Sequence, residues 1–341
     1  GSAQVRDVLR IDDAGTLTAF ASTQVTIGGL AFSPSGDLYV AEYLAGARVF
    51  RVFPTPSTVF WDGEAGDGLW QNPINWSHDT LPGPTDDAII DMPGDITVTL
   101  SSGDHAVNSL NCKETLLVSG GSLDIGDTSD VGSLTFRGGT LSGVGDLTIG
   151  GSLNWVGGTM AGSGRTTIQP DAVMNLNNPY SGTSIAFVLD GRVLDNYGTV
   201  NFYCQASGSA KQFGMNNGAV FNNYNRFIDK TLYTSHMSNG FVAGSGGSGG
   251  FHNFGHFVKT TGTSFQVWGG VAFDNTGVVD VQAGWLGLHG GGTSTGTFTG
   301  AAGTSLVLDG QNLNASSSIS GHRVSLYNST VAGSYAATGS T

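Results

Sequence analysis

The sequence is poor in charge, in cysteine and in long apolar runs, and each shortage excludes a class of protein. Only 11% of the 341 residues are charged, and 13 Lys and Arg against 26 Asp and Glu give a net charge of −13. Because no basic cluster interrupts this acidic excess, we expect neither nucleic acid nor an anionic membrane surface as a partner. No segment approaches the roughly 18 consecutive apolar residues of a membrane-spanning helix, so no membrane insertion is expected.

The motifs of several enzyme classes are missing as well. The sequence contains no G-x-S-x-G, no phosphate-binding loop, no dinucleotide fingerprint in a strand–helix context and no segment with the pattern of an amphipathic helix. Glycine, in contrast, is abundant, with 55 residues, and 39% of the chain is apolar. This composition provides many turns and enough apolar surface to offset chain entropy, so most of the chain should be ordered.

One short phrase recurs four times and identifies the chain as a repeat array. The four copies are Leu194 to Gly198, Phe221 to Asn225, Phe251 to Gly255 and Phe273 to Gly277. Their central asparagines are Asn196, Asn223, Asn253 and Asn275, which are 27, 30 and 22 residues apart. Each copy runs into a β-rich tail and reads as a turn followed by a strand. We predict that these asparagines form a buried amide ladder at one corner of a β-solenoid, where they satisfy backbone groups that a tight turn leaves open.

Alternating strands fill the chain from Ile96 onward. Segments such as 122–125 and 146–149 alternate strictly, and glycine pairs such as Gly120-Gly121 and Gly138-Gly139 separate the strands. A glycine pair allows the positive φ angles that the corners of a compact coil require. The pattern predicts an all-β fold, a parallel β-helix or solenoid over residues 96–341 with loop insertions at 205–260. The general preference of parallel crossovers favours a right-handed solenoid.

The two cysteines, Cys112 and Cys204, are too far apart in such a solenoid to pair. Coils of roughly 20–30 residues stacked about 4.8 Å apart would separate them by roughly 15–20 Å. A disulfide requires Cα atoms within about 7 Å of one another. We therefore expect two unpaired, buried thiols.

Two segments whose composition and pattern differ from those of the coils precede them. Residues 1–53 contain short strands separated by Gly, Asp and Pro turns, and Gly28 to Ala41 resembles the NHL-type repeat of bacterial extracytoplasmic propellers. A closed propeller needs at least four blades, so this segment would be a partial blade or a β cap. Residues 54–95 contain three tryptophans, Trp61, Trp70 and Trp76, which predict a bulky cap over the open end of the coil stack.

The tryptophan-rich segment and the coils both resemble known families. From Trp61 to Asp91, the chain resembles the W-x-G…G-x-W…N-W opening found ahead of β-helical regions in large bacterial surface and exported proteins. Phe273 to Phe298 resembles a coil of the passenger-like β-helices of bacterial adhesins and autotransporters. The resemblance implies an extracellular or cell-surface location. Because the chain opens Gly1-Ser2 and closes inside the pattern, we expect a fragment whose targeting segments lie elsewhere.

The rare ionisable residues concentrate between Gln205 and Thr260, where the repeat lengthens. Loops from neighbouring coils project from one side of a solenoid and could line a groove there. Asp229 is the only carboxylate in this window, so a mechanism with paired carboxylates lacks a partner. Lys230, Tyr233 and His236 are candidates for the base of a lyase. Further candidates for ligand binding are Lys211, Tyr224, Arg226, His252, His256 and Lys259. The alternative is that all of these are solvated loop residues.

No metal site is predicted. His252 and His256 point to the same side of one expected strand but lie about 13 Å apart when extended, too far to share a zinc ion. Two acidic turns, Asp124 to Asp127 with Asp130 and Asp86-Asp87 with Asp91, carry oxygen ligands that Ca²⁺ could use. Neither turn follows the calcium-roll or helix–loop–helix pattern, so we expect no cofactor.

Three functions remain open at this point. The preferred one is a non-catalytic extracellular β-helix for structure or adhesion, whose open coil ends stack with other copies into fibres. The second is a β-helix lyase or hydrolase acting on an extracellular polysaccharide. The third is a glycan-binding module, which is favoured if Trp155, Trp268 or Trp285 stand outward in a row.

Overall fold

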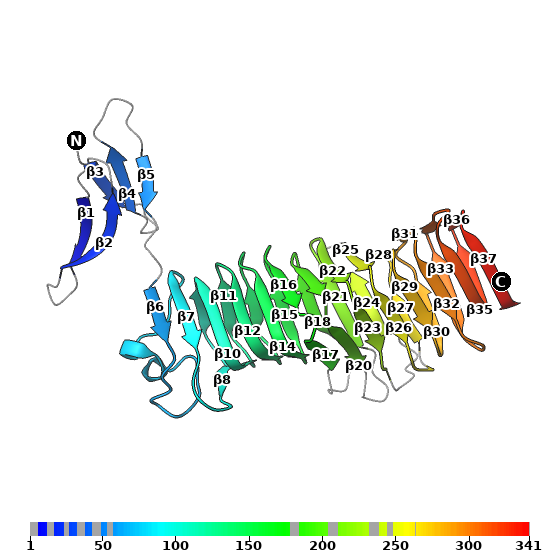
Figure 1. Cartoon of the computed structure of the whole chain (residues 1–341), viewed down its shortest axis with the longest axis horizontal. Helices are drawn as coiled ribbons and strands as arrows, with labels where there is room; N and C mark the ends of the chain where they lie inside the picture. Colours follow the sequence, from blue (N-terminus) through cyan, green and yellow to red (C-terminus); the bar gives the residue numbers. More distant parts are fainter. Residues whose placement is uncertain are drawn as a thin grey trace. The chain divides into compact units, whose positions relative to one another are not determined.

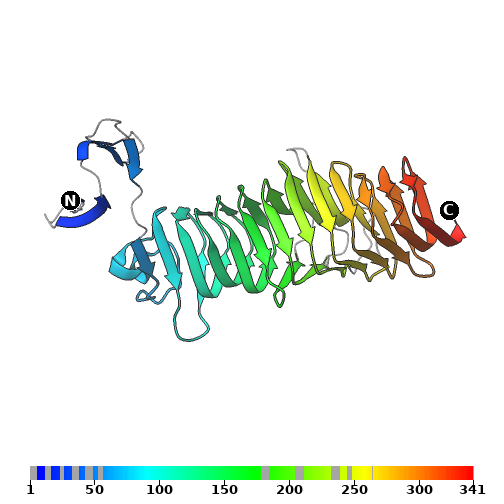
Figure 2. The ribbon, with the colours of Figure 1, turned by 45° about the horizontal axis from the view of Figure 1, so that its top comes forward.

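The computed structural model of the protein is shown in Figures 1 and 2. It describes residues 6–11, 17–23, 27–32, 38–42, 49–52, 57–177, 184–203, 211–231, 239–243, 248–262 and 264–340. The chain divides into two compact units, Gly1–Ser57 and Thr58–Thr341. In the first unit, β1 (Arg6–Ile11) and β2 (Leu17–Thr23) form an antiparallel pair. A separate antiparallel meander contains β3 (Ile27–Phe32), β4 (Leu38–Glu42) and β5 (Val49–Val52).

The second unit is a parallel β-helix, which confirms the all-β solenoid predicted from the repeats. Each coil contributes a strand to three long parallel sheets, called A, B and C here, and the coils follow one another along the axis (Figures 1 and 2). Some strands turn a corner without interruption, so β10 (Ser109–Val118), β12 (Ser129–Phe136) and β14 (Leu147–Trp155) belong to sheet A at their start and to sheet B at their end. The described residues contain no α-helix.

The other strands fall into the three sheets as follows. Sheet A also contains β7 (Asp86–Ile90), β16 (Arg165–Ile168), β19 (Val193–Asn196), β22 (Ala219–Asn223), β25 (Gly249–Asn253), β28 (Val271–Asn275), β31 (Gly292–Ser294), β34 (Gln311–Leu313) and β36 (Thr330–Val331). Sheet B also contains β8 (Thr97–Leu100), β17 (Val173–Asn177), β20 (Thr199–Tyr203), β23 (Arg226–Asp229), β26 (His256–Lys259), β29 (Val278–Val281), β32 (Thr297–Gly300), the start of β35 (Ser318–Tyr327) and β37 (Ser334–Ser340). Sheet C contains β9 (Asp104–Val107), β11 (Ser122–Ile125), β13 (Thr140–Ser142), β15 (Gly158–Ala161), β18 (Ser184–Asp190), β21 (Lys211–Asn216), β24 (Asn239–Ala243), β27 (Ser264–Val267), β30 (Trp285–Leu288), β33 (Ser305–Asp309) and the end of β35.

The core consists of the inward side chains of the three sheets, stacked coil upon coil. The period-two alternation of the sequence places these side chains on one face of each strand. Phe221, Phe251 and Phe273 occupy register positions on β22, β25 and β28, and their rings stack with centroids 5.1 and 5.2 Å apart. Phe227 and Phe257 stack in the same way on sheet B at 5.0 Å. These ladders lock the register of the coils, because a slip by one residue would turn the aromatic rings outward.

The tryptophan-rich segment caps the N-terminal end of this core. It contains β6 (Ser57–Phe60) and two short 3₁₀ turns, Pro73–Asn75 and Ser77–Asp79. Trp70 pairs with β8 through its backbone, donating to Thr99 O at 2.9 Å. The Trp70 and Trp76 side chains are fully buried, and the Trp76 indole N–H donates to Trp70 O at 2.8 Å. The aromatic rings therefore cover the apolar side chains of the first coil.

Arg192 marks the place where the coils lengthen. Side-chain partners on successive coils are 18 or 19 residues apart between Asp104 and Arg165, and 27 or 30 residues apart around Asn223. The Arg192 side chain is buried there, and its Nε donates to Thr166 Oγ1 at 2.8 Å. Its terminal nitrogens donate to the carbonyl oxygens of Gly143, Gly145, Ala161 and Arg165. Burial lowers the pKa of Arg192 to about 10, which leaves the guanidinium charged at neutral pH.

Candidate functional site

Two residues expected in a loop groove, Asp229 and Lys259, lie inside the β-helix. They are register partners at the ends of β23 and β26, and Lys259 Nζ is 2.9 Å from Asp229 Oδ2 with both side chains 0% exposed. The Thr231 hydroxyl and backbone N–H donate to Asp229 Oδ1, and Lys259 Nζ also donates to Thr261 O at 3.0 Å. This placement differs from the expected one, because burial separates both charges from any ligand on the outer surface.

The three residues considered as a catalytic base are only partly described. Lys230 directly follows β23, and its Nζ lies 5.7 Å from the centroid of the Tyr203 ring. Tyr233 and His236 lie outside the described residues. Lys211 is the first residue of β21, and its side chain is likewise outside the described part. A catalytic role for this group stays a prediction.

The remaining candidates spread over two faces of the solenoid. Arg226 and His256 are exposed register partners, and they are the first residues of β23 and β26 in sheet B. His252 lies on sheet A, with Nε2 3.3 Å from Asp274 Oδ2. Tyr224 lies at the corner between the two sheets, where its ring stacks on the Tyr197 ring at 4.6 Å.

The stack at this corner continues to Phe254, whose ring centroid is 4.8 Å from that of Tyr224. Desolvation by its neighbours raises the pKa of Tyr224, and the nearby negative charge of Asp195 adds to the effect. Because the ring faces in such a stack cover one another, mainly edges are left for a ligand. We interpret this stack as an external aromatic ladder that stabilises the corner.

The four recurrent asparagines form a continuous buried ladder. Each side-chain N–H₂ donates to the Oδ1 of the asparagine on the next coil, at 2.8, 2.8 and 2.9 Å along the row Asn196, Asn223, Asn253 and Asn275. The same N–H₂ groups also donate to backbone carbonyls, for example from Asn223 to His256 O at 3.1 Å. Asn196 Oδ1 accepts from the Gly198 N–H at 3.1 Å. These contacts hold one corner of successive coils together and leave the ladder no surface for a ligand.

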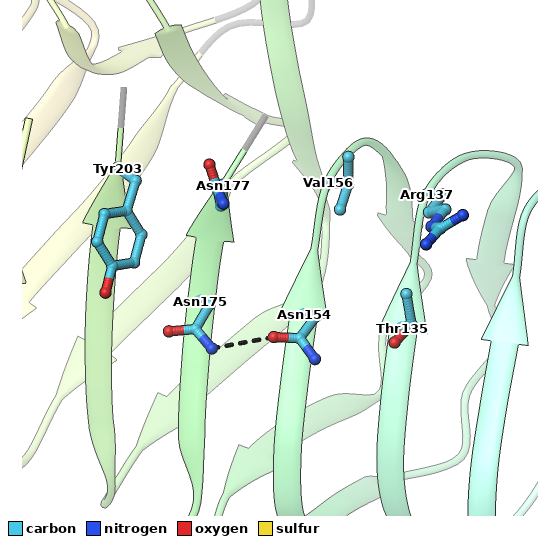
Figure 3. Close-up of a pocket in the computed structure, with 7 residues that line it drawn as sticks. All are labelled: Thr135, Arg137, Asn154, Val156, Asn175, Asn177 and Tyr203. Atoms are coloured by element: carbon cyan, nitrogen blue, oxygen red, sulfur yellow. Dashed lines mark hydrogen bonds between the residues drawn. The ribbon is translucent and has the colours of Figure 1, made fainter. Parts of the chain in front are cut away.

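A polar groove lies on the outer face of sheet B, over the ends of β12, β14, β17 and β20 (Figure 3). Its volume is about 490 Å³, and its described lining is Thr135, Arg137, Asn154, Val156, Asn175, Asn177 and Tyr203. Strand alternation explains the composition, since each of these side chains lies one residue away from an inward apolar one. Trp155, for instance, separates Asn154 from Val156 and is fully buried.

Amide groups form the floor of this groove. Asn175 Nδ2 donates to Asn154 Oδ1 at 2.9 Å (Figure 3). On the next coil, Asn201 Nδ2 donates to Asn175 Oδ1 at 3.0 Å. The Oδ1 atoms of Asn177 and Asn201 are buried and have no hydrogen-bond partner among the described residues. Buried polar atoms are normally paired, and Asn177 belongs to the groove lining, so its Oδ1 is an acceptor that a ligand hydroxyl in the groove would satisfy.

The charge in the groove has one sign. One row of outward side chains has one residue on each of five successive coils. In chain order these residues are Arg137, Val156, Asn177, Tyr203 and Lys230, and Arg137 at the first end is exposed. The described lining contains no carboxylate and no histidine. The groove is therefore suited to hydrogen bonding with hydroxyls and to pairing with anions.

Sequence reasoning missed the groove, although a signal was present. Asn154, Asn175 and Asn201 occupy outward positions of otherwise apolar strands and are separated by 21 and 26 residues. Those intervals are the coil lengths of this region, so alignment of consecutive coils would have placed the amides side by side. The ionisable residues between Gln205 and Thr260 were the more conspicuous signal in the sequence.

The other expected sites are placed as follows. Trp155 is fully buried between Phe136 and Phe187, so it cannot serve as an outward sugar platform. Cys112 is a buried free thiol, and desolvation raises its pKa to about 12. Cys204 lies outside the described residues.

The acidic turns make ordinary protein contacts. Asp87 accepts hydrogen bonds from Asn108 and Ser109, and Asp124 accepts one from Ser142. Asp91 pairs with Lys113. In the described part of the chain, no three His, Cys, Asp or Glu side chains come together as a metal site would require.

The fold defines the protein as a parallel β-helix. Comparisons with protein-family models, curated proteins and solved structures found no match for this chain. Among the described residues, none belong to a helix with the length and apolarity needed to traverse a bilayer.

Proposed function

We propose that the protein is a non-catalytic, extracellular or cell-surface β-helix that binds a linear anionic polysaccharide along the groove on sheet B. The observation that carries this proposal is the groove itself. It combines asparagine amides, the Asn177 Oδ1 acceptor that has no partner among the described residues, and flanking cations, in a chain whose net charge is −13. The resemblance of the coils to passenger-like β-helices of bacterial adhesins supports the same location and an adhesive role.

The dimensions of the groove suit an extended glycan that runs along the solenoid axis. Arg137 and Lys230 stand four coils apart, which corresponds to about 19 Å at a spacing of about 4.8 Å per coil. A sugar ring is about as long as one coil is high, so consecutive sugars would meet consecutive asparagines. The amides bind hydroxyls, Tyr203 offers a ring for stacking, and the two cations pair with uronate carboxylates.

The chemistry of the groove favours binding over cleavage. Glycosidases need two carboxylates, and lyases need a base close to the cleaved unit. The described lining contains no carboxylate, and Asp229 is inside the core, so the pair that a glycosidase needs is missing there. A base for a lyase would have to come from Tyr203, Arg137 or the neighbouring Lys230. A lyase that uses Lys230 with Tyr233 and His236 is the alternative that the experiment below separates from binding.

Titration calorimetry with polygalacturonate tests the proposal. Arg137→Ala and Tyr203→Ala should each weaken binding about tenfold, because a charge-assisted hydrogen bond or a stacked ring contributes roughly 1.4 kcal/mol or more. Binding should also weaken as salt is added. Arg323→Ala, which removes an exposed arginine on sheet C, is the matched control and should leave affinity unchanged.

Three results would contradict the proposal. The first is a parent protein that does not bind polygalacturonate, and the second is equal binding by Arg137→Ala and the parent. The third is release of unsaturated uronate products by the parent, which would show that the protein is a lyase.

A further inference from the structure

A second row of side chains crosses four coils at the end of sheet C. Val267, Leu288 and Leu308 are register partners that point inward on β27, β30 and β33. The residues that follow them are Trp268, His289 and Asp309, and Asp309 is in turn the register partner of Tyr327 on β35. Trp268 and Tyr327 are among the exposed large side chains, 37% and 56% exposed. The row therefore presents an aromatic ring at each end and two polar groups between them.

The rings at the Trp268 end of this row are held in place by their neighbours. The His289 ring stacks on Trp268 at 5.8 Å with an interplanar angle of 29°, and its other neighbour is Trp285, at 5.9 Å. A Cβ atom at Gly287 would lie 2.6 Å from His289 Nε2 and 2.9 Å from Trp285 Cη2. The absence of a side chain at Gly287 thus lets both rings lie over the strand. A preordered aromatic surface loses little side-chain entropy when it binds a ligand.

The polar groups in the row define the kind of ligand. Asp309 Oδ1 accepts a hydrogen bond from Asn328 Nδ2 at 3.1 Å, so a carboxylate and an amide lie beside the rings. A carboxylate accepts hydrogen bonds from sugar hydroxyls and repels uronates. This chemistry is opposite to that of the groove on sheet B, where the charged groups are cations.

We propose that this row, from Trp268 to Tyr327, is a second glycan-binding site, which takes a neutral, linear oligosaccharide lying along the solenoid axis. The two terminal rings are three coils apart, about 14 Å at a spacing of about 4.8 Å per coil, so the site spans about three sugar rings. Tyr327 and the face of Trp268 that His289 leaves uncovered stack on pyranose faces, while His289, Asp309 and Asn328 bind hydroxyls. The site does not depend on the groove on sheet B and shares no residue with it.

Calorimetry and tryptophan fluorescence with cellohexaose, mannohexaose and N-acetylchitohexaose test the proposal. The parent should bind at least one of these neutral probes, and Trp268→Ala and Tyr327→Ala should each weaken that binding about tenfold or more. Trp268→Phe should retain part of the affinity because it keeps a stacking ring. Tyr335→Ala, at another exposed tyrosine on β37, is the matched control and should bind like the parent.

A variant of the first groove keeps the two proposals distinguishable. Arg137→Ala should leave binding of the neutral probe unchanged even though it weakens binding of polygalacturonate. The second site is refuted if the parent binds none of the three neutral probes, or if Trp268→Ala and Tyr327→Ala bind the probe as tightly as the parent. It is also refuted if only Arg137→Ala weakens that binding.

Discussion

Two buried charges, those of Asp229 and Lys259, are held by hydrogen bonds as well as by each other. Asp229 and Lys259 bind each other inside the core, next to Phe202 in the register of sheet B. Removing two charges from water is costly, and the attraction between them offsets that cost only when the remaining polar atoms are also paired. Thr231 and Thr261 provide such contacts.

We predict that breaking this pair destabilises the protein more than removing it. Lys259→Met leaves the Asp229 carboxylate buried without its ion-pair partner and should cost about 3–5 kcal/mol of unfolding free energy. The double variant Asp229→Leu with Lys259→Met should recover most of that loss, because neither charge is then buried. Denaturant melts of the three proteins, followed by circular dichroism, measure the difference. Equal losses in the single and double variants would contradict a coupled pair.

These two residues also show where sequence reasoning reached its limit. Asp229 follows Phe227 by two residues, and Lys259 follows Phe257 by two, so strand parity places all four side chains on the inward face. Because Asp229 and Lys259 are ionisable, they were expected in a loop. Their position in the strand alternation correctly indicates that they are buried. The asparagine ladder was easier to predict, because the same residue returned in the same phrase on each coil.

At the scale of single elements, the cap depends on one acidic side chain. Asp67 Oδ1 accepts from the Leu69 N–H at 3.0 Å and from Asn75 Nδ2 at 2.6 Å, and Oδ2 accepts from Asn72 Nδ2 at 2.7 Å. The hydrogen bond from the Leu69 N–H, followed by those from Asn72 and Asn75, lowers the pKa of Asp67. The ionised carboxylate is therefore the form that the folded cap prefers.

We predict an acid-sensitive cap. A carboxylate whose pKa is lowered on folding stabilises the native state above the ordinary Asp pKa of about 3.9, and this contribution is lost as pH falls through the folded pKa. At neutral pH, Asp67→Asn should melt at a lower temperature than the parent, and the gap should shrink as pH falls below about 4. Thermal melts monitored by tryptophan fluorescence at pH 7 and pH 3 provide the check. A gap that stays constant with pH would rule out this role.

The number of residues at each corner varies from coil to coil, and this variation limits how much of the site can be predicted from the sequence. The existence of the strands and their arrangement in a parallel solenoid follow from alternation and glycine pairs, and both were predictable. Which side chains meet on the outer face depends on the register between coils, whose partners are separated by 18 residues near Ser142 and by 30 near Asn253. A shift of a few residues at one corner would move Asn175 away from Asn154, so the groove could not be read from composition.

At the scale of the whole molecule, the β-helix is a stack of coils in which each coil contacts its neighbours. The tryptophan cap closes the N-terminal end of this stack with Trp61, Trp70 and Trp76. Head-to-tail association into fibres stays a prediction. Association through the N-terminal end of the stack would require the cap to move away from the core. The cap thus acts against association there, as terminal units of solenoids generally do.

We predict that opening the cap promotes self-association. Trp76→Ala removes a fully buried indole from the end of the core and should lower the unfolding free energy by about 3–5 kcal/mol. The exposed coil end should then associate with other copies, which sedimentation velocity detects as species larger than the parent at equal concentration. Ile74→Ala, an exposed cap residue, is the control and should sediment like the parent. A monomeric Trp76→Ala protein that is as stable as the parent would contradict this role.

The asparagine ladder also gives the interior a direction. The Nδ2 atoms of Asn196, Asn223 and Asn253 each donate to the Oδ1 of the asparagine on the following coil, so the amide dipoles of the row align head to tail along the solenoid axis. Aligned amides polarise one another, and each hydrogen bond in the row strengthens its neighbours. The negative end is satisfied by the Gly198 N–H, and the positive end, at Asn275, by Ser294 and Thr297 O. Reversing one amide would set two like poles face to face, so the hydrogen bonds fix the orientation of every amide in the row.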